Sequence, residues 1–429
     1  RNTVLRMIVI VGAGVAGLVC ARKLQAAGED YLLVDASDAP GGRLRTDEID
    51  GFRLDRGFQV FLDSYPTARR HVEIPALRPR YFDSGALVHD DGDFFRVLHP
   101  LRHPTGALSA ALDPVIPRAD KLHLSTLVAS SCVHSDASLL ARCASTNEPS
   151  ARDLLTRLGF SETFLRRFAQ PFFGGVLLDN DLESSAGLFC YYLKKFVTGR
   201  ALTPARGIGE IPRQLAEDLP DRRLRFNTRV DRIDPNAVVT SEGESIPADA
   251  VILATDEPST HAILGQASSD ARPARGVTTV YFGSTRPLYT GALLVLPAGN
   301  ARLVRHLVQL TNVSPSLAPD GEHVISATIL NARGMDDTAL ADAARAEIET
   351  IFDEAREALT TLHVVRVPYA QPTQLPGFAA TLQLPETPPH VILAGDQTGS
   401  GSIEAAMASG ERAAAELLQS EIRNPKSEI

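Results

Sequence analysis

The sequence predicts an α/β fold in which a parallel-sheet domain is interrupted by a second, α+β domain. Three observations support this prediction. Residues 7–35 read as a strand, a glycine-rich turn, a helix and a second strand. Residues 391–403 read as a buried strand followed by another glycine-rich turn. Between these segments the regular alternation of strand and helix is lost, as expected if other structure is inserted into the domain.

The first segment opens with the apolar run Met7–Val11, which is rich in β-branched residues and short enough to be a strand buried on both faces. Residues 18–28 then read as a helix with an apolar face that ends at a glycine cap. A second apolar strand at 31–34 leads to Asp35, 18 positions after Gly17. This separation is close to the value of about 20 that is typical of an acid that binds a ribose hydroxyl.

Three glycines, Gly12, Gly14 and Gly17, have the spacing G-x-G-x-x-G between strand and helix. A Cβ at the first would obstruct the tight turn, and one at the second would hold a pyrophosphate away from the backbone N–H groups. A Cβ at the third would separate the helix from the strand. Because strand, glycines, helix and acid occur in register, they predict a dinucleotide site, which also includes Ala16 and Ala36. The motif alone leaves NAD and FAD open.

Composition and charge limit the classes of partner. A chain of 429 residues predicts two or three domains of about 150 residues each. The formal net charge of −9 gives no support for nucleic-acid binding. No apolar run long enough to cross a bilayer and no secretory signal is visible. The four cysteines form no C-x-x-C pair, so we expect no metal site and a reducing, cytoplasmic compartment.

A second glycine pair, Gly41 and Gly42, comes directly before Arg43. Flexible backbone at this pair would approach a ligand closely, and the guanidinium would counter a phosphate or bind a ribityl hydroxyl. Residues 51–61 then alternate polar and apolar side chains, as in a strand, and Gly57 allows another close approach.

The C-terminal motif is a strand at 391–394, followed by Gly395 and Asp396, a glycine-rich turn, and a helix of small residues that Ser402 can cap. Backbone N–H groups at the start of this helix, near Ile403, would stabilise negative charge on a ligand. The two ends of the chain therefore favour one shared site.

These residues together resemble the superfamily of FAD-dependent amine oxidases, protoporphyrinogen oxidases and phytoene desaturases. The matching motifs are G-x-G-x-x-G, the acid, P-G-G-R, a D-x-G segment at 55–57 and the C-terminal G-D turn. The resemblance implies bound FAD in a Rossmann-like domain of the GR2 type. The implied FAD-binding domain comprises residues 1–64, 201–257 and 385–429, and the inserted α+β substrate-binding domain comprises residues 65–200 and 258–384.

The resemblance also implies where each matching residue lies. The Gly-Gly-Arg run and Asp396 would contact the pyrophosphate and ribityl chain, the 57–59 segment would pass beside the isoalloxazine ring, and the backbone of Val230 would face the adenine. The helix start near Ile403 would face the flavin O2 atom. The predicted cofactor-binding residues are Gly12, Gly14, Ala16, Gly17, Asp35, Ala36, Gly41, Gly42, Arg43, Gly57, Phe58, Gln59, Val230, Ala254, Thr255, Gly395, Asp396, Ser402 and Ile403.

Two departures narrow the resemblance. Amine oxidases of this superfamily place aromatic residues in the C-terminal turn, where they hold the amine. The corresponding positions here are Gly399 and Ser402, and the chain has no Trp. The turn also lacks the Cys used for covalent flavin attachment. The match therefore favours the desaturase-like branch with non-covalent FAD.

We therefore predict an FAD-dependent oxidoreductase that removes a hydride from a C–H bond of an apolar, isoprenoid- or porphyrinogen-like small molecule. No catalytic acid or base is assigned, and Gln59 is expected to orient the ring. An apolar substrate would favour peripheral contact of a cytoplasmic protein with a membrane. Three alternatives stay open: an amine oxidase with a different pocket, a non-enzymatic binder resembling the GDP dissociation inhibitors of prenylated GTPases, and an NAD-only dehydrogenase.

The inserted segments carry less specific patterns. Residues 65–200 read as mainly helical, with Ser150 and Ser161 as N-caps and a break at 171–176. An aromatic cluster in this region is predicted to be part of the core. The basic residues of the same region are predicted to form a solvated face. The aromatic cluster comprises Phe164, Phe168, Phe172, Phe173, Phe189, Tyr191, Tyr192 and Phe196, and the basic residues are Arg166, Arg167, Lys194, Lys195 and Arg200. Other predicted elements are a turn and helix at 205–219, strands at 223–230, 250–256, 278–283, 303–310 and 323–330, a helix at 337–359 and a Pro-rich connector at 368–390.

Overall fold

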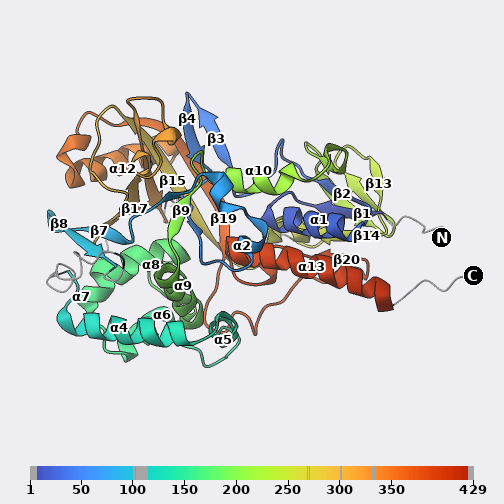
Figure 1. Ribbon diagram of the computed structural model, residues 1–429, viewed down its shortest axis with the longest axis horizontal. Helices are drawn as coiled ribbons and strands as arrows, with labels where there is room; N and C mark the ends of the chain where they lie inside the picture. The colour runs from blue at the N-terminus through green and yellow to red at the C-terminus, as the bar shows by residue number, and fades with distance from the viewer. Residues whose placement is uncertain are drawn as a thin grey trace, which may run out of the picture.

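A computed structural model describes residues 7–99, 102, 115–267, 269, 271–299, 302–330, 332 and 334–423 (Figure 1). The predicted α/β fold is confirmed by a sheet of five parallel strands in the order β10-β2-β1-β14-β20. Its strands are β1 (Ile8–Val11), β2 (Tyr31–Val34), β10 (Leu224–Arg225), β14 (Ala250–Leu253) and β20 (Val391–Leu393). Because these strands come from three distant parts of the chain, the sheet brings the two ends of the sequence together.

The first βαβ unit agrees with the prediction. Helix α1 (Val15–Ala27) begins directly after the glycine turn, three residues earlier than the sequence pattern indicated, and Gly28 caps it with a left-handed φ of 82°. The strand predicted at 223–230 is wrong as a continuous element. Asn227 has a φ of 52°, which interrupts the extended chain, so that β10 ends before it and β11 (Val230–Asp234) starts a separate small sheet.

A seven-stranded sheet forms the second layer, in the order β19-β15-β18-β17-β16-β7-β8. The predicted strands at 278–283, 303–310 and 323–330 are confirmed as β15, β17 and β18. The seven strands are β7 (Gly85–Asp90), β8 (Asp93–Leu98), β15 (Ala274–Ser284), β16 (Leu294–Pro297), β17 (Val304–Gln309), β18 (His323–Ile329) and β19 (Thr360–Pro372). The region at 80–98 was wrongly predicted as part of a mainly helical segment. Its strand β7 pairs with β16, about two hundred residues away, and such a tertiary pairing leaves no local signal.

One face of this sheet is covered by helix α12 (Asp337–Ile351). The helix ends eight residues before the predicted boundary, because Phe352 is extended and a short 3₁₀ turn follows. The segment 360–372 then forms β19, so the predicted connector starts after this strand and not at 368. The opposite face of the sheet contacts the segment around β4 (Phe52–Asp55), and it lines a cavity together with turns of the five-stranded sheet.

Residues 118–198 form a helical layer (Figure 1). It contains α4 (Arg118–Val133), α5 (Asp136–Arg142), α6 (Ala151–Arg157), α7 (Glu162–Phe164), the π-helical turn η2 (Leu165–Ala169), α8 (Gln170–Leu177) and α9 (Ala186–Thr198). Ser150 and Ser161 are confirmed as N-caps. The predicted break at 171–176 is wrong: Pro171 is the second residue of α8, directly after the π-helical turn η2, and the helix continues to Leu177.

The aromatic cluster of this layer is confirmed as mainly core, because its members belong to one buried apolar cluster or pack against it, but Tyr192 and Phe196 also line the cavity described below. The basic residues are not a freely solvated face. Arg166 and Arg167 pair with Asp90. Lys194 and Lys195 pair with Asp136, and Arg200 pairs with Asp63.

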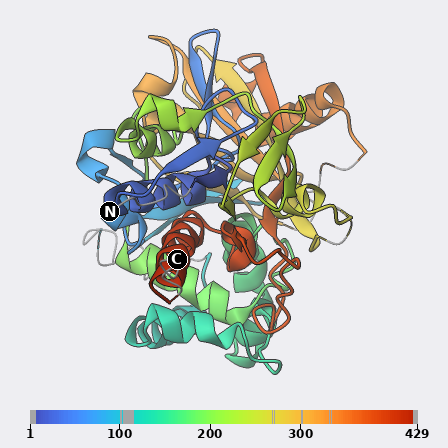
Figure 2. The same cartoon turned by 90° about the vertical axis from the view of Figure 1, so that its right-hand side faces the viewer.

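Smaller elements connect these layers. They are the hairpin β3 (Thr46–Ile49) and β4, the sheet of β5 (Phe61–Leu62), β9 (Ala201–Thr203) and β6 (Arg80–Tyr81), the sheet of β11, β12 (Ala237–Thr240) and β13 (Ser245–Pro247), and the helices α2 (Ala68–His71), α10 (Glu210–Glu217), α11 (Glu257–Ile263) and α13 (Ile403–Arg423). The 3₁₀ turns are η1 (Ile74–Leu77), η3 (Asp221–Arg223), η5 (Leu310–Asn312), η6 (Pro315–Leu317), η7 (Asp353–Ala355) and η8 (Asp396–Thr398). Figure 2 shows α13 packed beside α1, between the helical layer and the β-rich remainder. Within the described residues, no helix combines the length and the apolar character that crossing a membrane requires.

Candidate flavin and substrate site

A cavity of about 570 Å³ lies between the two large sheets. One side consists of turns that follow β1, β2, β14 and β20, at the carboxyl edge where parallel sheets bind ligands, together with the segment after β4 and the start of β11. We call this side the turn wall. It contains every predicted cofactor-binding residue except Gly17, namely Gly12, Gly14, Ala16, Asp35, Ala36, Gly41, Gly42, Arg43, Gly57, Phe58, Gln59, Val230, Ala254, Thr255, Gly395, Asp396, Ser402 and Ile403.

The glycines of the first motif have two different functions. A Cβ on Gly14 would meet no atom within 4 Å, because this position faces the open cavity. A Cβ on Gly17 would lie 1.9 Å from the backbone oxygen of Gly12, so Gly17 is needed for close packing of α1 and not for lining the cavity. Gly41 donates its N–H to the Ala13 carbonyl at 2.9 Å, which places the second glycine pair against the first turn. The two glycine turns therefore bring their backbones together at the cavity.

Asp35 occupies the end of β2, as predicted. Its Oδ2 atom accepts the Ala13 N–H at 2.6 Å and its Oδ1 atom accepts the Ser37 N–H at 2.7 Å. These two bonds hold the carboxylate in place at the cavity, and each oxygen retains a lone pair for a ribose hydroxyl.

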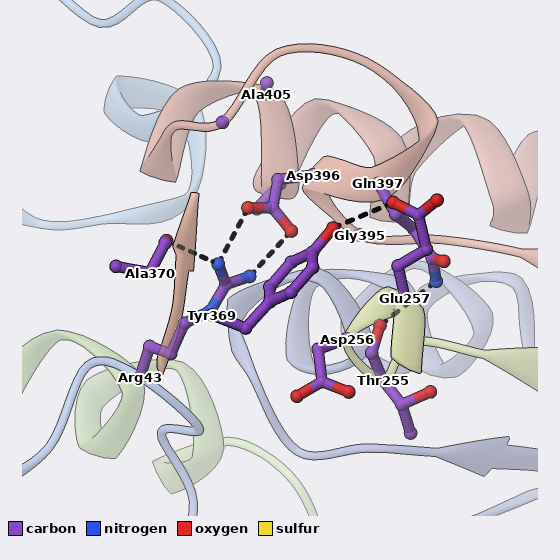
Figure 3. A network of polar contacts seen from close by, with 12 residues as sticks. Arg43, Thr255, Asp256, Glu257, Tyr369, Ala370, Gly395, Asp396, Gln397 and Ala405 are labelled. Atoms are coloured by element: carbon purple, nitrogen blue, oxygen red, sulfur yellow. Dashed lines mark hydrogen bonds and ion pairs between the residues drawn. The ribbon is translucent and has the colours of Figure 1, made fainter. Parts of the chain in front are cut away.

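Arg43 and Asp396 join the two ends of the chain (Figure 3). The guanidinium binds the carboxylate in a two-pronged pair, with Nη1 at 2.9 Å from Oδ2 and Nη2 at 2.6 Å from Oδ1, and Nη1 also donates to the Ala370 carbonyl at 2.8 Å. The Gln59 amide donates to the Arg43 carbonyl at 2.8 Å. The first and last motifs, 353 residues apart, therefore form one polar unit in the turn wall.

A buried network next to this pair was not predicted. Glu257 accepts from Arg272 Nε at 2.9 Å and from the Tyr369 hydroxyl at 2.8 Å. Arg272 also donates to the Gln397 carbonyl at 2.7 Å. The Gln397 amide donates to the Thr255 carbonyl at 3.0 Å (Figure 3). The network ties the turn after β14 to the turn after β20. In the sequence, only their positions just after Ala254-Thr255 and Gly395-Asp396 could have indicated Glu257 and Gln397.

The Asp of the D-x-G segment also has a role that sequence reasoning missed. Asp55 Oδ1 accepts the Thr46 hydroxyl at 2.6 Å and the Ile208 N–H at 3.0 Å. Burial raises its pKa to about 6, although both hydrogen bonds oppose the shift. Asp55 thus fastens the β3–β4 hairpin to the glycine turn before α10, and its backbone carbonyl accepts the Gly57 N–H at 2.8 Å.

The start of α13 agrees with the predicted cap, because the Ser402 hydroxyl accepts the Ala405 N–H at 3.0 Å. Two further contacts fix this end. The buried Glu404 carboxylate accepts the Thr67 and Ala68 N–H groups, and the Tyr192 hydroxyl donates to the Gly401 carbonyl at 3.1 Å. An aromatic residue therefore does lie beside the C-terminal turn, but it comes from α9 and not from the turn itself.

The other side of the cavity is formed by the seven-stranded sheet and by the helical layer, and we call it the sheet wall. It comprises Gly175, Val176, Leu178, Tyr192, Phe196, Val277, His306, Thr328, Val367, Ala370 and Gln371. None of these described residues is charged. His306 is buried, its Nε2 atom lies 2.9 Å from the Pro171 carbonyl oxygen, and burial lowers its pKa to about 4. Sequence reasoning did not identify this histidine.

Comparison with known proteins agrees with this geometry. The family model described as flavin containing amine oxidoreductase matches residues 15–418. The chain belongs to this family. Family membership makes it an FAD-dependent oxidoreductase, so the NAD-only and non-enzymatic alternatives no longer apply.

Relatives of this oxidoreductase differ in the substrates that their names state. A phytoene dehydrogenase of Streptomyces griseus is 27% identical over 371 residues, which cover 74% of this chain and 71% of the relative. A solved structure from Exiguobacterium sp. 255-15, assigned as a protoporphyrinogen oxidase, superposes with a TM-score of 0.71 at 20% identity, covering 97% and 99% of the two chains. The cyclohexylamine oxidase of Brevibacterium oxydans IH-35A gives a TM-score of 0.69 at 18% identity, covering 97% and 100%. The two structural likenesses concern the fold alone.

Proposed function

We propose that this oxidoreductase removes a hydride from a C–H bond of an apolar small molecule of the isoprenoid or porphyrinogen type. The observation that carries the proposal is the sheet wall, which offers valine, leucine and aromatic side chains and no charged residue among those described. Such a surface favours an apolar ligand, because burying a charged group without a partner is costly.

The turn wall supports a specific arrangement for the cofactor. Gly14 and Gly42 leave room for the pyrophosphate, Asp35 for the ribose, and the Arg43–Asp396 pair for the ribityl chain. When bound, FAD supplies the hydride acceptor. The chain's own residues hold it, direct the N–H groups at the start of α13 toward it, and exclude water from the apolar side.

The division into two domains remains part of the proposal. The turn wall draws on residues 12–59, 230–255 and 395–403, which fall inside the predicted FAD-binding segments. The sheet wall draws on residues 175–196 and 277–371, which fall inside the predicted substrate-binding segments. The chemical contrast between the walls supports this division.

Anaerobic reduction of the flavin tests the proposal. We expect an apolar polyene or a porphyrinogen to bleach the flavin absorption, and a primary amine such as cyclohexylamine to leave it unchanged. Reduction by the amine alone would replace the proposal with amine oxidation.

Flotation with liposomes tests the predicted peripheral membrane contact in the same preparation, because an apolar substrate would reach the cavity from a bilayer.

A further inference from the structure

The sheet wall is mainly apolar, but a row of polar side chains crosses the sheet that forms it. Thr279 on β15 is opposite Thr328 on β18, and Thr328 is opposite His306 on β17. Directly opposed residues of antiparallel strands point to the same face, so these three polar side chains form a row across the sheet. Thr279 is already engaged, since its hydroxyl accepts the Phe58 N–H at 3.3 Å. His306 and Thr328 line the cavity.

The protonation of His306 follows from its partners. Its Nε2 atom lies 2.9 Å from the Pro171 oxygen and 3.2 Å from the Phe172 oxygen, and carbonyl oxygens only accept hydrogen bonds. Nε2 must therefore carry the proton, and with a pKa of about 4 the ring is neutral at physiological pH. Nδ1 is then an acceptor, and the hydrogen bonds of this ring to described residues are those of Nε2.

The position of the ring is tightly determined. A Cβ on Gly175 would lie 2.0 Å from the imidazole, so only glycine at this point of α8 allows His306 to reach the helix carbonyls. The ring also meets Phe58 edge-on, with the ring centroids 6.4 Å apart. His306 is therefore a fixed acceptor beside the segment predicted to pass near the flavin ring.

Thr328 is a second unsatisfied polar group in the same wall. The residue is 3% exposed, and its Oγ1 atom has no hydrogen-bond partner among the described residues. A rotation about χ1 exchanges the hydroxyl and the methyl group between staggered positions, so either can face the cavity. Buried hydroxyls are normally hydrogen-bonded, and an unpaired one is costly.

We propose that the substrate is an apolar molecule that carries a hydroxyl group, and that this hydroxyl donates to His306 Nδ1 and accepts from Thr328. The inference rests on the proposed function of the same cavity and narrows its substrate class. A carboxylate or an ammonium group fits less well, since the sheet wall has no opposite charge among its described residues. A pure hydrocarbon would leave both polar groups unpaired.

Three probes separate these possibilities: farnesol, farnesyl methyl ether and β-farnesene. The alcohol has a donor and an acceptor, the ether has only an acceptor, and the hydrocarbon has neither. Dissociation constants are measured from the change in flavin absorption on titrating the FAD-loaded full-length protein. We expect farnesol to bind roughly five-fold more tightly than the ether, which is the effect of about one hydrogen bond.

Variants assign that preference to the two residues. Thr328→Val removes the hydroxyl at nearly constant shape, Thr328→Ser keeps it, and His306→Phe removes Nδ1 while keeping a ring. The preference for farnesol over β-farnesene is expected to fall in Thr328→Val and to persist in Thr328→Ser. In His306→Phe the preference for farnesol over the ether is expected to disappear.

The outcomes also separate this inference from the proposed function. Equal binding of all three probes to the wild-type protein would overturn the hydroxyl site and leave the apolar cavity intact. No response to any probe, in protein that contains FAD, would overturn both. If a variant loses its flavin or fails to fold, the ratio of the dissociation constants of farnesol and farnesyl methyl ether for the wild-type protein still tests the hydroxyl site.

Discussion

The two walls of the cavity are built by different means. The turn wall consists of turns at the ends of parallel strands, with backbone N–H groups, glycines and the Arg43–Asp396 ion pair. The sheet wall is the face of a mixed, mainly antiparallel sheet with two helices against it, and it contains apolar side chains and a few neutral polar ones. The first wall depends on backbone shape and charge pairing, whereas the second depends on strand register and packing. Mutations in the two walls should therefore have different consequences.

The largest expected effect concerns the ion pair of the turn wall. Arg43→Ala leaves the Asp396 carboxylate, whose side chain is 5% exposed, without its partner. We expect a loss of about 3 kcal/mol in the free energy of unfolding of the FAD-free protein, at the low end for breaking a buried pair because Arg43 is partly exposed. FAD retention should fall as well. Urea unfolding and flavin absorption after gel filtration measure the two effects.

Arg45→Ala is the matched control for this variant. Arg45 lies two residues away and pairs with the exposed Asp38, so its loss should cost less than about 1 kcal/mol. Equal destabilisation by both variants would show that the loop, and not the Arg43–Asp396 pair, carries the effect.

The next effect comes from the sheet wall and depends on pH. The pKa of His306 is about 4 in the folded protein and about 6.5 in the unfolded chain. As the pH falls from 6.5 to 4, the unfolded chain gains a proton that the folded protein does not, so stability is lost, by up to about 3 kcal/mol. His306→Gln removes this dependence. The variant's free energy of unfolding relative to wild type should therefore rise as the pH falls through this window.

Variant and wild type are compared at each pH, because the titration of Asp55 changes the stability in the opposite direction with pH. Its pKa is raised to about 6, so the folded protein loses stability as the pH rises from about 4 to 6. Asp55 is present in both proteins and cancels in the difference. A difference that stays constant from pH 7 to 4 would contradict a neutral, buried His306.

A smaller effect separates two glycines of one motif. Gly17→Ala places a methyl group against the Gly12 carbonyl, and we expect a loss of about 1–3 kcal/mol even without cofactor. Gly14→Ala points into the cavity and should leave the stability of the FAD-free protein nearly unchanged while weakening FAD binding roughly tenfold. Thermal unfolding with and without added FAD distinguishes them. A destabilised FAD-free Gly14→Ala protein would show that this glycine, too, serves packing.

The contrast between the walls also explains what the sequence could reveal. The turn wall was predictable because a specific residue must occupy a specific place in each turn: Gly14 has to lack a side chain, and Asp35 and Asp396 have to lie in the turns that follow their strands. The sheet wall was not predictable, because the opposition of His306 and Thr328 depends on the register of two strands that meet only in the folded chain. The same reason hid β7, whose partner β16 lies far away in the sequence.

Local signals also failed where tertiary contacts overruled them. Pro171 and the glycines after it indicated a break, but Gly175 is there to admit the His306 ring against an unbroken helix. The buried Glu257 gave no signal of its own, since a carboxylate next to a strand end is common and its partners Arg272 and Tyr369 lie elsewhere in the chain. The predicted boundaries of the two domains remain predictions that limited proteolysis can test.

The smallest expected effect concerns a contact between the two walls. Tyr192 belongs to the sheet wall, and its hydroxyl donates to the Gly401 carbonyl of the turn wall at 3.1 Å. Tyr192→Phe leaves this carbonyl without that donor, which should lower the free energy of unfolding by about 1 kcal/mol and weaken FAD binding about five-fold. Tyr191→Phe is the control, because Tyr191 is equally buried on the same helix and no hydrogen bond joins its hydroxyl to the turn in the described structure. Urea unfolding and FAD titration should show an effect for the first variant and little for the second. Similar losses in both would mean that the aromatic packing of α9, and not the hydrogen bond, holds the turn in place.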